Sequence, residues 1–133
     1  MNRELAAYIN EWLMKARNDL LSAQRLIEIE PVILDTACFH CQQAVEKSLK
    51  AFLIFKGIPI EKTHNLNFLI GECAIIDPDF CNMDLMEMNS YAVKIRYPDD
   101  YFLPEINEVR DIYQQAILIN ELVKSKVEIN LGK

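Results

Sequence analysis

Apolar residues recur at helical spacing along almost the whole chain. In the first segment, one stripe of apolar residues has this spacing: Tyr8, Trp12, Ala16, Ala23 and Ile27. Positions three or four residues apart share a face of a helix, so this stripe predicts an amphipathic helix that packs on a core. Pro31 is expected to end that helix, because proline lacks an N–H and restricts the residue before it.

The next segments predict a long helix and a short one. The long helix starts near Pro31 and ends at Gly57, because glycine suits the left-handed conformation that often ends a helix. The short helix follows a loop and is capped by Thr63 or Asn65, whose side chains accept hydrogen bonds from free backbone N–H groups.

Two further helices are predicted in the second half of the chain. Asp77 and Pro78 are typical of a helix start, so a fourth helix is expected from there towards Tyr97, ending near Pro98. Pro104 then opens a fifth helix with acidic residues in its first turns, which suits the helix dipole.

No strand pattern, repeat or linker interrupts this series of helices. We therefore predict an all-α protein, an antiparallel up-and-down bundle of four to five helices with short connections. Residues 1–133 suit a single domain with one core, and the tail after about residue 127 is expected to fray.

Composition and charge narrow the functional classes. The 133 residues are 51% hydrophobic, and no apolar run is long enough for a membrane span. The first residues do not form a signal peptide, so we expect a cytoplasmic protein with no membrane partner. The net charge of −6 argues against tight, sequence-blind binding of nucleic acid. The three glycines form no phosphate-binding loop.

The segment CFHC (38–41) raises the question of a metal or redox site. Cys38 and Cys41 lie one turn apart within a helix, on the same face as apolar residues, and far from a helix N-terminus that would activate a thiol. A zinc site would need two more ligands, and no second C-x-x-C pair supplies them. We therefore expect these cysteines to pack in the core, with no metal or cofactor.

Polar residues occupy the other sides of the same helix: Gln42, Gln43, Glu46, Lys47 and Lys50. One interpretation is a solvated face on which Glu46 pairs with Lys50 four residues later. The other is a central helix, because apolar residues also lie among these polar ones.

The segment KIRYPDDYF (94–102) places Arg96 beside a proline-containing turn. Arg96 can complement the C-terminal end of a helix. It can also present its planar guanidinium to a phosphate, with Asp99 and Tyr101 nearby to orient the contacts.

Four segments, in this order, resemble the HEPN family of small helical domains. They are WLMKARNDLLSAQRLI (12–27), FHCQQAVEKSLKAFLIFKGI (39–58), THNL (63–66) and RYPDD (96–100). The resemblance implies a bundle of four or five helices that commonly forms a homodimer. Many members are encoded beside a minimal nucleotidyltransferase as a toxin–antitoxin pair. Active members are metal-independent ribonucleases with an Arg-x(4–6)-His motif, and others bind nucleotides or RNA.

This chain departs from the active pattern. Arg96 matches the arginine of the motif, but Tyr101 stands where histidine is expected, and no histidine follows Arg96. We therefore predict a module that binds a nucleotide, RNA or a nucleotidyltransferase partner without cutting RNA efficiently. Its predicted ligand-binding residues are Arg96, Lys47, Lys50, Glu46, Asp99 and Tyr101. Glu46 is expected to anchor Lys47 or the arginine.

Two alternatives remain open. One is a ribonuclease toxin that uses a relocated histidine, with Arg96, His40 and His64 as candidate catalytic residues. For His40, a contact with the core or with a partner chain is expected as much as a catalytic role. His64 is expected to contact backbone groups at the start of a helix. The other alternative is a plain dimeric interaction module with no small-molecule site.

Overall fold

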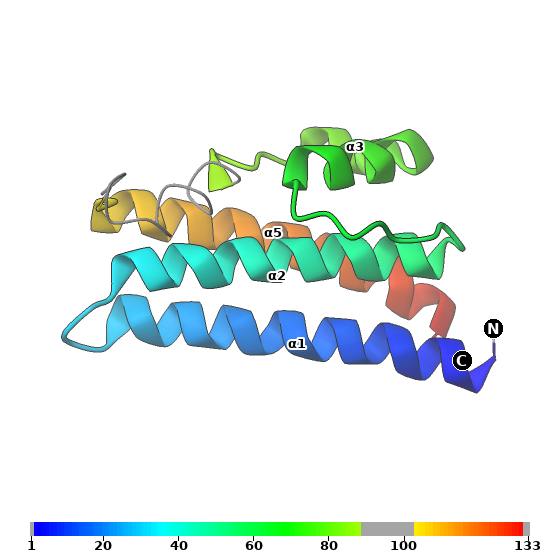
Figure 1. The fold of residues 1–133 in the computed structure, drawn as a ribbon, viewed down its shortest axis with the longest axis horizontal. Coiled ribbons are helices and arrows are strands. Elements are labelled where there is room, and N and C mark those ends of the chain that lie inside the picture. The colour runs from blue at the N-terminus through cyan, green and yellow to red at the C-terminus, as the bar shows by residue number, and fades with distance from the viewer. Residues whose placement is uncertain (1, 89–102, 132–133) are drawn as a thin grey trace.

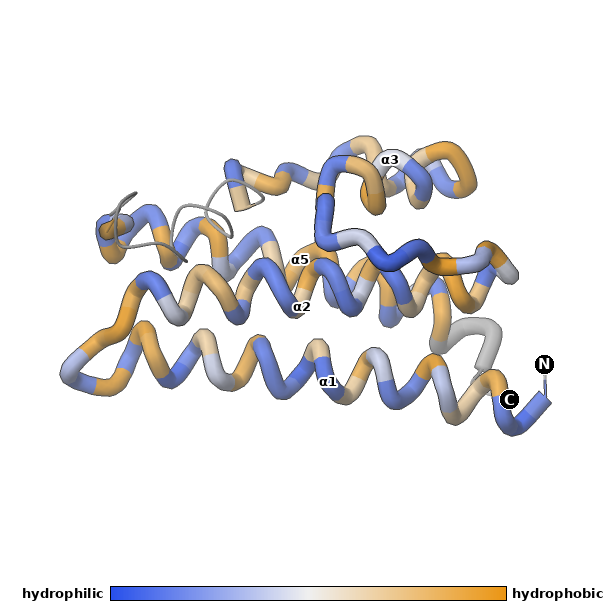
Figure 2. The backbone as a smooth tube through the Cα atoms, in the orientation of Figure 1, coloured by the Kyte–Doolittle hydropathy of each residue, from blue (hydrophilic) through white to orange (hydrophobic). Residues whose placement is uncertain are grey.

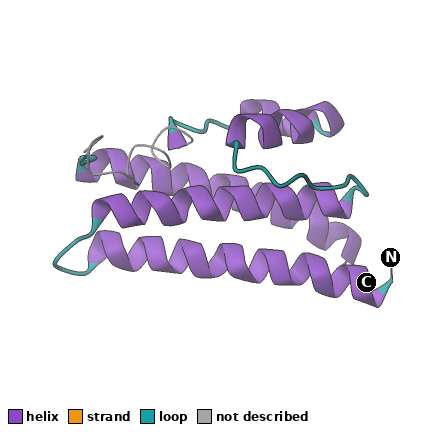
Figure 3. Ribbon diagram, in the orientation of Figure 1, coloured by secondary structure: helices purple, strands orange, loops and turns teal. Residues whose placement is uncertain are grey.

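The computed structural model describes residues 2–88 and 103–131, the last four of these by their backbone alone. Within these ranges the chain forms four α-helices and one 3-10 helix, with no strand. The elements are α1 (Arg3–Glu28), α2 (Leu34–Phe55), α3 (Leu66–Ile76), the 3-10 helix η1 (Pro78–Asn82) and α5 (Ile106–Leu131). The predicted all-α bundle is confirmed (Figure 3).

The three long helices lie side by side, with α2 between the other two and α3 above it (Figure 1). α1 and α2 run in opposite directions, and α5 runs in the same direction as α2. This is the relation between the second and fourth helices of an up-and-down bundle. The connection from α2 to α3 is hydrophilic over much of its length and returns along α2 (Figure 2). No helix in the described ranges is long and apolar enough to cross a membrane.

Most of the predicted helix limits are close to the observed ones. α1 ends at Glu28, shortly before Pro31. After α2, Gly57 has a φ of +75°, and the N–H of Ile58 donates to the carbonyl of Leu53 across the helix end. α3 begins after Asn65, whose side chain accepts a hydrogen bond from the N–H of Phe68.

The predicted fourth helix is wrong at its start. Asp77 caps a helix as expected, but only the five residues of η1 follow it. The chain then leaves the helical conformation, and Met86 and Glu87 have positive φ values of 52° and 68°. Phe80 is buried and packs on Phe52, with ring centroids 4.7 Å apart. This contact fixes the 3-10 turn on the core. The rest of the predicted helix, towards Tyr97, lies outside the described residues.

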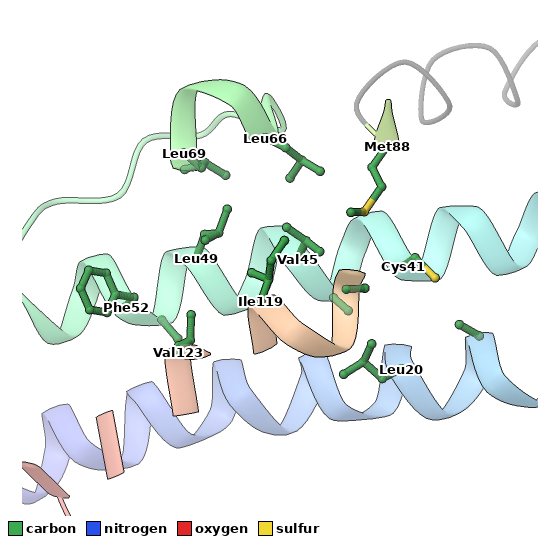
Figure 4. Close-up of a cluster of buried hydrophobic side chains, with 14 of the residues drawn as sticks. Leu20, Cys41, Val45, Leu49, Phe52, Leu66, Leu69, Met88, Ile119 and Val123 are labelled. Carbon is green, nitrogen blue, oxygen red and sulfur yellow. The ribbon is translucent and has the colours of Figure 1, made fainter. Parts of the chain in front are cut away.

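α2 is the centre of the core. Fourteen of its 22 residues are buried, compared with six of the 26 residues in α1. Leu49 and its neighbours on α2 lie between side chains of α3 and α5 (Figure 4). Asn120 of α5 donates a buried hydrogen bond of 2.9 Å to Ser48. These contacts support the interpretation of α2 as a central helix and not as one with a solvated face.

The cysteines of α2 point into this core, as predicted. Cys38 and Cys41 are buried, and so is Cys73 of α3. Burial is the main cause that raises the pKa of the Cys38 and Cys73 thiols to about 12 each, and it also raises the pKa of Cys41. A thiol that stays protonated is a weak nucleophile and a poor metal ligand. Packing is therefore the role that the structure gives these three side chains.

Candidate functional site: a pocket between α1 and α2

A pocket of about 380 Å³ opens between the first half of α1 and the second half of α2. The antiparallel arrangement of the two helices brings these halves together, and the connection after α2 adds one side chain from outside them. The lining residues are Tyr8, Glu11, Trp12, Lys15, Glu46, Lys47, Lys50 and His64. They give the pocket one aromatic wall and one charged wall.

The aromatic wall consists of Tyr8 and Trp12. Their ring centroids are 6.2 Å apart and their planes are nearly perpendicular, at 81°. Both were predicted to face the core, but Tyr8 is 45% exposed, and Ile9 is the residue of this turn that is fully buried. Trp12 is partly buried and packs against the core as predicted, and it also lines the pocket, whereas Tyr8 lies at the exposed edge of the stripe.

The charged wall is organised around Glu46. Its carboxylate is buried and accepts hydrogen bonds from Lys50 Nζ at 3.1 Å and from His64 Nδ1 at 3.0 Å. The amide of Gln42 donates to it as well, at 3.4 Å. Lys50 Nζ also lies 5.9 Å from the ring centroid of Trp12, which links the two walls through a cation–π contact.

Asp19 of α1 organises a second group of charges beside the pocket. Its two oxygens accept from Lys47 Nζ at 2.6 Å and from His40 Nδ1 at 2.8 Å. Asp19 is 7% exposed, so its charge needs these partners. Lys47 lines the pocket, whereas His40 does not.

The structure brings together four of the predicted site residues: Glu46, Lys47, Lys50 and His64. It corrects two of the predicted contacts. His64 contacts the Glu46 carboxylate and not the backbone groups of a helix start. Lys47 is anchored by Asp19 and not by Glu46, while the alternative partner predicted for Glu46, Arg96, lies outside the described residues.

The remaining predicted ligand residues are in a different part of the chain. Arg96, Asp99 and Tyr101 lie outside the described residues.

Asp19 was not predicted as a site residue, and neither were the residues of α1 that line the pocket. Asp19 has the same helical spacing as the apolar stripe and directly precedes the buried Leu20. A carboxylate at such a position was the sequence signal that could have indicated its role. Lys15 and Glu11 carry no comparable signal, because charged residues on a helix are usually solvated.

The charges around the pocket nearly cancel. Three lysines (Lys15, Lys47 and Lys50) are opposed by three carboxylates, namely Glu11, Glu46 and Asp19. His64 supplies the imidazole of the lining, and its side chain is 76% exposed. Within the described ranges, no three His, Cys, Asp or Glu side chains come together as a metal site. The arrangement suits a small ligand with a flat ring and a modest negative charge.

Comparison with known proteins identifies the family. The HEPN domain profile matches residues 9–126, which is most of the chain. An archaeal HEPN homologue, ST0689, has a similar crystal structure, with a TM-score of 0.65 at 24% identity over 96% of this chain and 99% of its own. TT1696 from Thermus thermophilus is similar with a TM-score of 0.67 at 25% identity over 95% of this chain and 99% of its own. No match was found among curated proteins. The chain therefore belongs to the HEPN domain family.

Proposed function

We propose that this HEPN chain binds a nucleotide, either free or as an unpaired nucleotide of RNA, in the pocket between α1 and α2. One observation carries the proposal: two aromatic rings, three lysines and a histidine line one space of about 380 Å³. Small-ligand pockets have volumes of roughly 300–1,000 Å³, so this one is large enough for a single nucleotide.

Each wall would bind one part of that ligand. Aromatic side chains stack on the faces of unpaired bases, and Trp12 supplies the largest ring of the pocket. Lys15 and His64 are available for a phosphate at the open side, since Lys15 is exposed and His64 is mostly so. Lys47 and Lys50 of α2 add positive electrostatic potential to the pocket. Asp19 holds Lys47 in place and Glu46 holds Lys50.

Arg96, Asp99 and Tyr101 belong to the proposal on sequence grounds alone. Arg96 would bind phosphate through its planar guanidinium, and Asp99 and Tyr101 would orient the contacts. Without a histidine after Arg96, the Arg-x(4–6)-His route to RNA cleavage lacks its proton carrier. We therefore propose binding without efficient cleavage.

Calorimetric titration with adenosine monophosphate and with a short unstructured RNA tests the proposal. Saturable binding is expected, and Lys15→Ala should weaken it roughly fivefold, since one charge-assisted contact at an exposed site contributes about 1 kcal/mol. Lys62→Ala is the matched control, because Lys62 is exposed and outside the pocket. If neither ligand binds the wild type, the proposal is wrong and a plain interaction module is favoured.

One observation favours the alternative of a ribonuclease with a relocated histidine. The Glu46 carboxylate holds His64 at Nδ1, which leaves Nε2 directed away from that contact. Carboxylates orient catalytic histidines in the same manner. RNA cleavage by metal-free protein that persists in His40→Ala and disappears in His64→Ala would establish this activity. Cleavage that is unchanged in both variants would count against a relocated histidine.

A nucleotidyltransferase partner, a toxin–antitoxin role and a homodimer are further proposals that rest on the family resemblance. Sedimentation of the purified chain measures its oligomeric state. Co-expression with a nucleotidyltransferase encoded beside it, followed by copurification, tests the partner. A toxic role is supported if expression of the wild-type chain arrests growth and expression of Arg96→Ala does not. Unchanged growth of cells that express the wild-type chain counts against it.

A further inference from the structure

We infer that His64 makes the pocket selective for a ligand with a phosphate, and that binding the phosphate takes up one proton at Nε2 of His64. Glu46 is the positioning residue for this imidazole. The inference rests on the proposed function, because it concerns the ligand of the same pocket.

The contact between His64 and Glu46 determines which nitrogen carries the proton. Nδ1 lies 3.0 Å from Oε1 of the carboxylate, and an ionised carboxylate can only accept a hydrogen bond. Nδ1 is therefore the donor. In the neutral ring Nε2 then carries a lone pair and acts as an acceptor, which disfavours a phosphate oxygen. A phosphate oxygen that carries no proton can accept a hydrogen bond at Nε2 only after that nitrogen gains a proton and becomes a donor.

The carboxylate is held firmly enough to keep this orientation. Glu46 is 4% exposed, and its second oxygen accepts from Lys50 at 3.1 Å. Gln42 contacts the same oxygen as His64, at 3.4 Å. Because these partners occupy the carboxylate, rotation away from His64 would break several hydrogen bonds in a buried site. The imidazole itself is largely exposed, so it can exchange its proton with solvent.

The charges around His64 are opposed by charges of the other sign, so His64 is the group of the pocket whose charge is expected to change on binding. From α2, Glu46 is paired with Lys50, and Lys47 is paired with Asp19 of α1. From α1, Glu11 and Lys15 line the pocket with opposite charges, beside the phenol of Tyr8. On its own connection His64 follows the oppositely charged Glu61 and Lys62, both exposed.

These charges largely balance with the ring neutral, so an anion gains most from the protonated ring. The expected ligand is therefore a nucleotide with one phosphate, bound more tightly as the pH falls.

Calorimetry with two ligands in buffers of different ionisation enthalpy tests this inference. Adenosine monophosphate methyl ester keeps a single negative charge over the range in which histidine titrates, about pH 5 to 8, so the ligand itself takes up no proton. Adenosine, which has no phosphate, is the reference ligand. For the wild type, the ester should bind with net proton uptake. Its affinity should rise by up to about tenfold per pH unit as the pH falls.

Two variants complete the test. His64→Gln keeps a side-chain donor but cannot titrate, so it should bind the ester without proton uptake and with an affinity independent of pH. His40→Gln is the matched control, since His40 has a similar carboxylate contact outside the pocket, and it should behave as the wild type. If the wild type binds the ester without proton uptake, the inference is wrong while the proposed function stands. If neither ligand binds at any pH, both fail.

Discussion

Asp19 of α1 and His40 of α2 are joined by a hydrogen bond of 2.8 Å between Oδ1 and Nδ1. The same relation joins Glu46 to His64, so each histidine of this chain is held at Nδ1 by a buried carboxylate. Each carboxylate also binds one lysine of α2. Buried carboxylates are unfavourable without such partners, so these groups fix how α1, α2 and the connection after α2 meet. The shape of the pocket follows from these contacts.

Replacing Asp19 with asparagine is expected to destabilise the bundle. The change removes the charge that holds Lys47 and the carboxylate oxygen that accepts the hydrogen bond of His40. Loss of a partly buried charged contact of this kind costs on the order of 1–3 kcal/mol of unfolding free energy. Urea unfolding measures the loss, and Glu11→Gln is the control, because this exposed carboxylate on the same helix should change stability by less than about 0.5 kcal/mol. Equal stability of both variants would show that Asp19 does not brace the helices.

Truncation of Phe80 tests whether η1 is anchored to the core. Phe80 is 1% exposed and packs on Phe52, so Phe80→Ala should lower the unfolding free energy by about 3–5 kcal/mol. Phe68 is 41% exposed, and Phe68→Ala should cost clearly less. Comparable losses in denaturant unfolding would contradict the described packing of η1.

Lys126 should make stability depend on pH at both extremes. Lys126 of α5 binds Asp77 at 2.9 Å and also binds Asp79, and its hydrogen bond lowers the pKa of Asp77 below the ordinary 3.8. A lowered carboxyl pKa adds stability above 3.8 that is lost as the pH falls through the folded value. The same contacts raise the pKa of Lys126 above the ordinary 10.5, so its share is lost only as the pH rises through that raised value.

Lys126→Met removes these contacts while keeping much of the side-chain volume. The stability difference between wild type and variant should be constant near neutral pH and should shrink below 3.8 and above 10.5. Thermal unfolding across the pH range measures it. A difference that stays constant down to strongly acidic pH would show that Asp77 is not paired with Lys126.

Thiol labelling should distinguish the four cysteines. Cys81 is exposed, whereas Cys38, Cys41 and Cys73 are buried and their pKa values are raised by burial. At about pH 8, a thiol reagent should modify one group rapidly in the folded protein and the other three only on unfolding. Cys81→Ser should abolish the rapid phase. Rapid labelling of a second thiol would contradict the burial of α2 or α3.

The sequence was informative where local chemistry decides the structure. Proline, glycine and capping side chains act within a few residues, so the ends of α1 and α2 and the start of α3 were predicted closely. The start of the fourth helix was mispredicted because Asp77 and Pro78 start a 3-10 helix as readily as an α-helix. Packing of Phe80 on the core then decides which one forms, and that contact comes from α2, distant in the sequence.

The pocket was only half predictable for the same reason. The signature residues of α2 indicated Glu46 and the lysines, and the Glu46–Lys50 pair lies within α2. The other partners, His64 for Glu46 and Asp19 for Lys47, come from other elements. Asp19 meets Lys47 across 28 residues of sequence, and no local pattern specifies that pairing. Trp12 has helical spacing like a core residue, and only the relative rotation of α1 and α2 shows that it lines a pocket.

The central claim is that a nucleotide occupies the space beside Trp12, and the most direct measurement is the NMR signal of the Trp12 indole N–H. Trp12 is the one tryptophan of the chain, so this signal is unambiguous. Addition of adenosine monophosphate should move it progressively to a saturated position, and Lys15→Ala should require more ligand to reach that point. The account would be contradicted if the nucleotide does not bind, or if it binds while the indole signal of Trp12 stays unchanged.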